Sequence, residues 1–118
     1  MKFDNNSPLY TQLAEELKKK ILMGVWKEDE KIPSVRDIAL EYGINPNTAQ
    51  KAIKILEEEE LVYAKRTLGK FVSKSKRETD QGLALMRRDI LRDSAKRLKE
   101  IETTREEALA LLDKIWEE

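Results

Sequence analysis

The chain has 118 residues, with 23 basic and 23 acidic side chains and with no cysteine and no histidine. This length supports one compact domain with an appendage and excludes a large enzyme fold. Without cysteine and histidine there can be no disulfide or thiolate metal site, and the commonest metal ligand and general base is missing. We therefore expect no enzyme, no cofactor and no metal site. No segment is long and apolar enough to cross a bilayer, which predicts a cytoplasmic protein.

The first predicted element is a helix that begins after Ser7 and ends at Gly24. Ser7 can cap this helix, with Pro8 at its first position. Trp26 follows in the next connection and is predicted to be a core anchor. The apolar residues of the helix recur every four positions along one face: Leu9, Leu13, Leu17 and Ile21.

Two short helices follow, with a tight turn between them. Ser34 can cap the first, with Asp37 at the capping-box position, and Gly43 can end it in a left-handed conformation. Asn45 can cap the second, with Pro46 in its first turn. The spacing of the second helix predicts a buried side made of Ala49, Ala52, Ile53 and Leu56.

The outward side of this second helix is polar and suits DNA. Its residues are Asn47, Thr48, Gln50, Lys51 and Lys54. Asn and Gln can form paired hydrogen bonds with adenine, Thr can touch a thymine methyl group or a phosphate, and Lys neutralises backbone charge. The alternative is that this side is only the solvated face of an amphipathic helix. The helix by itself leaves both interpretations open.

A basic hairpin is predicted next, from short strands at residues 61–63 and 71–72. The segment between them contains Lys65, Arg66, Thr67, Leu68, Gly69 and Lys70. Residues 61–77 hold six basic and no acidic side chains, although the charges of the whole chain balance. A hairpin of this kind fits a phosphate backbone or a minor groove. Residues 1–77 hold 15 basic and 12 acidic residues, so the positive excess lies in this part.

Two helices, a turn and a basic hairpin form the layout of a winged helix-turn-helix. From about residue 8 to residue 74, the sequence resembles the GntR family of bacterial transcription regulators. The family's Leu-Pro-Ser-x-Arg is matched at residues 32–36 (Ile-Pro-Ser-Val-Arg), and its Val-Ser-x-x-Thr-Val-x-x-Ala at 44–52 (Ile-Asn-Pro-Asn-Thr-Ala-Gln-Lys-Ala). Its Gly-x-Gly-Thr-Phe-Val wing is matched at 67–72 (Thr-Leu-Gly-Lys-Phe-Val), without the first glycine and the threonine. The Asn-Pro-Asn-Thr sequence at 45–48 looks like the YtrA subfamily.

The resemblance implies a mainly α fold with a small β-wing, and a set of DNA-binding residues. Arg36 would contact DNA, Asn45, Asn47, Thr48 and Gln50 would form the recognition surface, and Gly69 would shape the wing. Backbone contacts are expected from Lys51, Lys54, Lys65, Arg66, Thr67 and Lys70. The resemblance also implies a homodimer that represses an operon of the transporter type.

The tail is predicted to start with a polar linker over residues 73–79, followed by a long helix and a short one. Thr104 and Glu107 can form a capping box on the short helix. We expect a winged domain at residues 1–76 and a dimerisation tail at 77–118. Two helices cannot bury their own apolar side chains, so a second copy should cover them, the alternative being packing against the winged domain. The predicted dimerisation residues are Leu83, Met86, Ile90, Leu98, Ile101, Leu109, Leu112 and Trp116.

The leading hypothesis is therefore a homodimeric, sequence-specific regulator that binds double-stranded DNA at an inverted repeat. One alternative is a protein-interaction module that uses the acidic run at residues 57–60. Another is an architectural protein that binds DNA without regard to sequence, which the balanced total charge disfavours. No sequence feature indicates an effector pocket, and the sequence does not identify the operator or the regulated genes.

Overall fold

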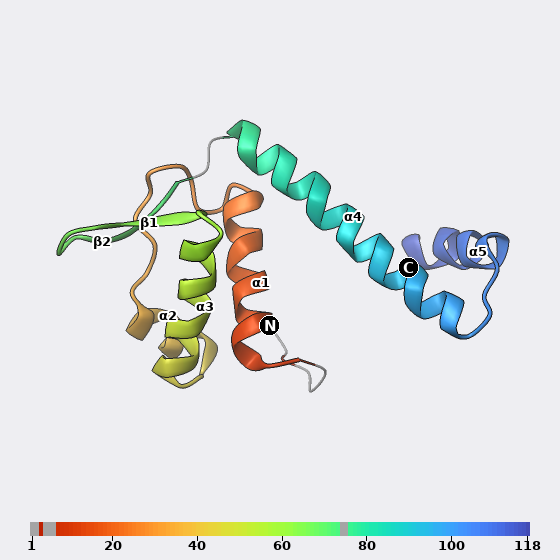
Figure 1. Ribbon diagram of the computed structural model, residues 1–118, viewed down its shortest axis with the longest axis horizontal. Helices are drawn as coiled ribbons and strands as arrows, with labels where there is room; N and C mark the ends of the chain where they lie inside the picture. The colour runs from red at the N-terminus through yellow and green to blue at the C-terminus, as the bar shows by residue number, and fades with distance from the viewer. Residues whose placement is uncertain (1–2, 4–6, 74–75) are drawn as a thin grey trace. The chain divides into compact units, whose positions relative to one another are not determined.

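The computed structural model describes residue 3, residues 7–73 and residues 76–118, the first two of the last range by their backbone alone. These residues form helices and one two-stranded antiparallel sheet (Figure 1). In chain order the elements are α1 (Leu9–Leu22), α2 (Val35–Tyr42), α3 (Pro46–Glu58), β1 (Val62–Lys65), β2 (Gly69–Val72), α4 (Lys76–Glu100) and α5 (Arg105–Trp116). The predicted class, mainly α with a small β-wing, is confirmed.

The chain divides into two compact units, Met1–Leu83 and Ala84–Glu118. The first unit contains α1 to α3 and the sheet, and the second contains most of α4 and all of α5. The predicted functional boundary after residue 76 remains a proposal. Of the residues that the structure describes, none belongs to a helix long and apolar enough to span a membrane.

The core of the first unit lies where α1 and α2 pack against α3. Burying one large apolar side chain stabilises a fold by about 1.5–3 kcal/mol. Trp26 is 8% exposed, so its prediction as a core anchor is confirmed. The largest fully buried side chains are Leu13, Leu17, Ile21, Ile38, Ile53, Leu56 and Val72.

The predicted turn between α2 and α3 is confirmed by its hydrogen bonds. The Ser34 hydroxyl oxygen accepts a hydrogen bond from the backbone N–H of Asp37 at 3.1 Å. Gly43 ends α2 with φ of 64°, a conformation that glycine adopts without steric cost. Asn45 caps α3 by accepting from the N–H of Asn47 at 2.8 Å. These local bonds fix where α3 begins and therefore which side chains its first turns expose.

Two sequence-based predictions are wrong at helix starts. Pro8, rather than Ser7, is the extended N-cap residue of α1, with ψ of 145°, and it makes no side-chain cap because its ring has no hydrogen-bond acceptor. The Ser7 carbonyl instead accepts from the Gln12 side chain at 2.7 Å. The predicted linker over residues 73–79 is helical from Lys76, since Lys, Arg and Glu favour helices despite their charge. Residues 74 and 75 of that prediction lie outside the described residues.

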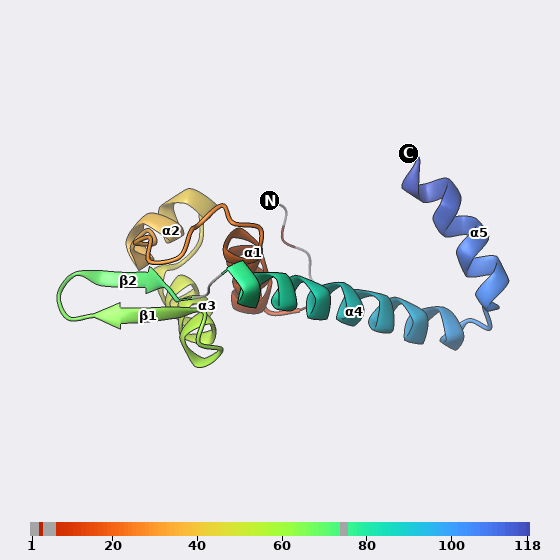
Figure 2. The same cartoon turned by 90° about the horizontal axis from the view of Figure 1, so that it is seen from above.

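In the second unit, α4 and α5 diverge after a turn in which Glu102 has φ of 58°. Figure 2 shows α5 leaving the end of α4 instead of packing along it. The predicted capping box is confirmed: the Thr104 hydroxyl accepts from the N–H of Glu107 at 3.1 Å, and the Glu107 carboxylate accepts from the N–H of Thr104 at 3.0 Å. No residue of α5 is buried, so this unit has no closed apolar core around α5.

Candidate nucleic-acid interface

The polar face of α3 lies on the surface, as predicted. Asn45, Asn47, Gln50 and Lys54 are exposed, and Thr48 is half-buried. Ala49, Ala52, Ile53 and Leu56 are buried on the opposite side. The first two turns of α3 therefore present amide and hydroxyl groups that can donate to and accept from base edges.

Two other predicted contacts flank this face. Arg36 is exposed in the first turn of α2. The Lys51 ammonium lies 5.6 Å from the centre of the Tyr10 ring of α1, at a distance typical of a cation–π contact. Tyr10 thus holds Lys51 on the side of α3 that faces α1.

The wing is a hairpin in which Val62 pairs with Val72 and Lys65 pairs with Gly69. Both views show it extending away from the three helices (Figures 1 and 2). The strands are longer than the sequence predicted, so the turn is only residues 66–68. Lys65, Gly69 and Lys70 belong to strands because cross-strand pairing continues almost to the tip.

Gly69 has φ of 110°, a backbone conformation that other residues rarely adopt. A Cβ atom built there would lie 2.9 Å from the Cε atom of Lys31. The backbone conformation therefore favours glycine at this position, while the flexible Lys31 side chain could shift away from an added Cβ atom. This contact brings Lys31 into the wing region, which sequence reasoning missed.

One side of the wing carries an aromatic pair. Tyr63 and Phe71 stack with their ring centres 5.9 Å apart, and the Lys65 ammonium lies 4.4 Å from the Phe71 centre. The Tyr63 hydroxyl donates to the Asp29 carboxylate at 2.8 Å. This hydrogen bond raises the pKa of Tyr63, with smaller contributions from burial and from the negative charges of Asp29 and Glu28. The aromatic pair thus anchors the wing to the loop before α2.

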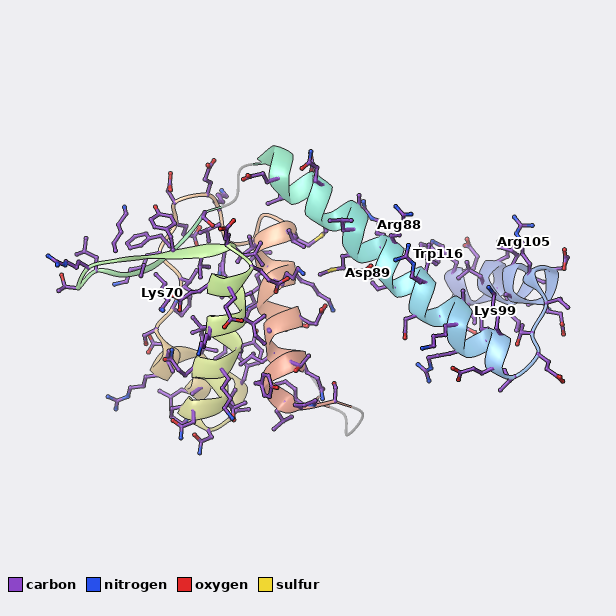
Figure 3. The ribbon with its side chains drawn as sticks, viewed as in Figure 1. Lys70, Arg88, Asp89, Lys99, Arg105 and Trp116 are labelled. Atoms are coloured by element: carbon purple, nitrogen blue, oxygen red, sulfur yellow. The ribbon has the colours of Figure 1, made fainter. Side chains whose placement is uncertain are left out.

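Lys70 points back toward the helices. Its ammonium donates to the carboxylate of Glu57 in α3, and both side chains are half-buried. Figure 3 labels Lys70 beneath the wing, on the side of the helices. The sequence placed Lys70 among the phosphate contacts, but in the structure its charge is already paired. The sequence does not predict this ion pair, because Glu57 and Lys70 come together only when β2 packs beside α3.

The acidic run at the end of α3 is partly neutralised within the first unit. Glu57 pairs with Lys70, and Glu59 pairs with Lys18 of α1 at 3.0 Å. Ion pairs of this kind hold α1 and β2 against the C-terminal turn of α3. The run therefore has a structural explanation, which weakens its case as a surface for a partner protein.

The predicted dimerisation residues lie on α4 and α5, except Ile101, which lies in the turn between these helices. Leu83, Met86 and Leu98 are half-buried. The remaining five are exposed, and the values for Ile101 and Trp116 reach 74% and 78%. Figure 3 labels Trp116 at the end of α5. Further apolar side chains on these helices are also exposed, and sequence reasoning did not select them: Leu85, Leu91, Leu111 and Ile115.

Comparison with known proteins agrees with the winged architecture. Residues 9–72 match the family of bacterial regulatory proteins named the gntR family. The chain belongs to the GntR family. GntR proteins are DNA-binding transcription regulators and not enzymes, so the polar face of α3 and the basic wing belong to a DNA-binding domain.

Among its relatives is YhcF of Bacillus subtilis, an HTH-type transcriptional regulator. YhcF is 29% identical over 107 residues, which cover 91% of this chain and 88% of YhcF. The repressor YtrA of the same organism is 36% identical over 75 residues, which cover 64% of this chain but only 58% of YtrA. The similarity to YtrA therefore covers only part of each protein.

Solved structures are similar to this chain, one over most of its length and another over a part of it. A GntR regulator from Listeria monocytogenes matches with a TM-score of 0.82 and 28% identity, covering 95% of this chain and 98% of that chain. The DNA-binding domain of AraR, solved in complex with the operator ORX1, matches with a TM-score of 0.57 and 30% identity. That match covers 61% of this chain and 93% of the AraR domain.

Proposed function

We propose that this GntR protein is a homodimeric, sequence-specific repressor of the YtrA type that binds an inverted-repeat operator. The observation that carries the proposal is the exposed polar face of α3 beside a basic wing, in a unit similar to an AraR domain solved with its operator. The residues that read bases are Asn45, Asn47, Thr48 and Gln50. Arg36, Lys51, Lys54, Lys65, Arg66 and Thr67 contact the backbone, with Gly69 shaping the wing.

The exposed apolar side chains of α4 and α5 support a second copy of the chain as the partner. A helix pair without a buried side chain on α5 gains stability only when another surface removes its leucines from water. A two-fold dimer would also place two recognition helices in half-sites about 34 Å apart, one turn of DNA. A dimer formed through α4 and α5 would therefore both cover this apolar surface and match an inverted repeat.

Repression is favoured by the names of the relatives. YtrA and NagR of Bacillus subtilis are both described as transcriptional repressors. A dimer bound across a promoter would exclude the polymerase. The resemblance to the YtrA subfamily points to an operon of the transporter type that includes the regulator's own gene. The protein would act in the cytoplasm, where bacterial DNA lies.

The proposal is tested on the DNA upstream of the protein's own gene. Overlapping duplexes from this region, and shuffled duplexes of the same composition, are titrated with the protein at physiological salt. At least one duplex should bind about 10³-fold more tightly than its shuffled control. Transcription in vitro from a promoter that contains this duplex should fall as the protein is added. Increased transcription would contradict the repressor role, and equal binding to shuffled DNA would indicate an architectural protein.

A further inference from the structure

We propose that Lys31 supplies a phosphate contact at the base of the wing, while Lys70 and Glu57 form a latch that positions the wing against α3. This inference rests on the proposed binding of double-stranded DNA. It assigns Lys31, which the sequence did not single out, to the interface. It also changes the role of Lys70 from a phosphate contact to a positioning residue.

The latch joins two elements through charge and backbone. The Lys70 ammonium donates to the Glu57 carboxylate, and the partial burial of both side chains limits screening by water. The Lys70 carbonyl accepts from the N–H of Ile32 at 2.9 Å. Lys70 is thus fixed from both sides, by α3 and by the loop before α2. A phosphate would therefore have to compete with Glu57 for the charge of Lys70.

Lys31 differs from Lys70 because its ammonium group is exposed and available for a contact with DNA. Lys31 is exposed and forms a β-bridge with Phe71, which keeps its backbone beside β2. Its aliphatic chain runs over Gly69, where a Cβ atom would lie 2.9 Å from Cε and 3.7 Å from Nζ. Among the described residues, no ion pair to the Lys31 ammonium is present.

Lys31 and the wing border a cleft of about 310 Å³ between β2 and the start of α2. Its two cations are Lys31 and Lys70, and none of its lining residues is acidic. Because Glu57 neutralises Lys70, Lys31 supplies the unpaired positive charge there. The Ser34 hydroxyl also lies in the lining and can donate to a phosphate oxygen, whereas the Thr67 hydroxyl already donates to the Arg66 carbonyl at 2.6 Å. The rest of the lining is mainly apolar, so the contact that we propose with the DNA backbone is made by the exposed Lys31 ammonium and not by the interior of the cleft.

The contact made by Lys31 is measured through the salt dependence of binding. The probe is a duplex recovered from a random pool by the wild-type protein. Lys31→Gln should reduce the slope of log affinity against log salt by about 0.9, the value for one lost phosphate contact, and weaken binding about fivefold at 0.15 M salt. Lys27→Gln is the matched control, because Lys27 is an exposed lysine of the same loop that does not line the cleft. An unchanged slope in Lys31→Gln would overturn its assignment.

The latch predicts a different response. Lys70→Gln and Glu57→Gln should each weaken binding while keeping the wild-type salt slope. The charge swap of Glu57→Lys with Lys70→Glu should restore the wild-type affinity. If Lys70 instead touched a phosphate, Lys70→Gln would lower the slope, Glu57→Gln would not weaken binding, and the swap would fail. Any of these three results would refute the latch.

A readout without DNA separates this inference from the proposed function. Both single substitutions should accelerate amide hydrogen exchange at Ile32 and Val72, whose N–H groups tie the wing to the loop before α2. Unchanged exchange would also refute the latch. If the wild-type protein bound no duplex at all, the proposed function would fail, and the exchange rates would still decide whether Glu57 and Lys70 position the wing.

Discussion

Gln50 lies in the second turn of α3, exposed beside the buried Ala49. A glutamine there can form two hydrogen bonds with adenine, whereas a lysine neutralises phosphate on any sequence. This contrast between Gln50 and Lys54 gives the two kinds of contact separate signatures in binding experiments.

We predict that Gln50→Ala relaxes specificity. The tightest-binding duplex should lose about 1–3 kcal/mol of binding free energy, while shuffled DNA binds as before. Lys54→Ala should weaken specific and shuffled duplexes alike and lower the salt slope by about 0.9. Titrations of both variants against both duplexes make the comparison. The reverse pattern would show that the roles of base reading and backbone contact are exchanged.

The ionisation of Glu107 should affect the stability of α5, because Glu107 is part of its capping box. Its pKa lies below the ordinary value because the Thr104 backbone N–H, and then the Thr104 hydroxyl, donate to its carboxylate. A carboxylate with a lowered pKa stabilises the folded state above its ordinary pKa of 4.5, and this contribution is lost as the pH falls through the lowered value.

Acidification below about pH 4.5 should therefore loosen the capping box of α5. The measurement is an NMR titration of the Thr104 and Glu107 amide protons. Glu107→Gln keeps an oxygen acceptor but cannot ionise, so its amide shifts should vary less with pH at these two positions. Identical titration curves for the two proteins would contradict this role of Glu107.

At the scale of elements, local rules account for the centre of the DNA-binding domain. The caps at Ser34 and Asn45, the left-handed Gly43 and the buried side of α3 follow from residues close in sequence, and the structure has them as predicted. The start of α4 was missed because a run of charged residues was interpreted as a linker, although such residues also favour helices.

The packing of the wing could not be predicted from the sequence. Three contacts of the wing join residues from different elements: Glu57 with Lys70, Lys31 with Gly69, and Tyr63 with Asp29. They depend on how the sheet packs against the loop and α3, which periodicity and turn signals do not encode. The sequence located the basic wing but not which of its cations are free.

Gly69→Ala should test the geometry of the wing. The substitution places a Cβ atom on a backbone with φ of 110°, and this strain remains even if the Lys31 side chain moves aside, so we expect a loss of about 1–3 kcal/mol in unfolding free energy. Gly43→Ala is the control, because Gly43 also has positive φ, at 64°, but has no atom within 4 Å of the added Cβ. Chemical denaturation should show a larger loss for Gly69→Ala. Equal losses would mean that alanine strains the backbone at position 69 no more than at position 43.

At the scale of the whole molecule, the tail should determine the oligomeric state. Ile90→Glu combined with Leu98→Glu places charges on the apolar surface of α4, so the variant should be a folded monomer with much weaker affinity for the operator. Lys96→Glu is the control, since Lys96 is an exposed polar residue of the same helix. Sedimentation equilibrium measures the mass. An unchanged dimer in the double variant would show that these residues do not form the interface.

The most direct test of the whole account is selection of random duplexes by the purified protein at physiological salt, followed by sequencing and by the mass of the complex on the enriched duplex. The account predicts an inverted repeat with half-sites about one helical turn apart, occupied by two copies of the chain. Retention of DNA without an enriched sequence, or one copy bound to a single half-site, would contradict it.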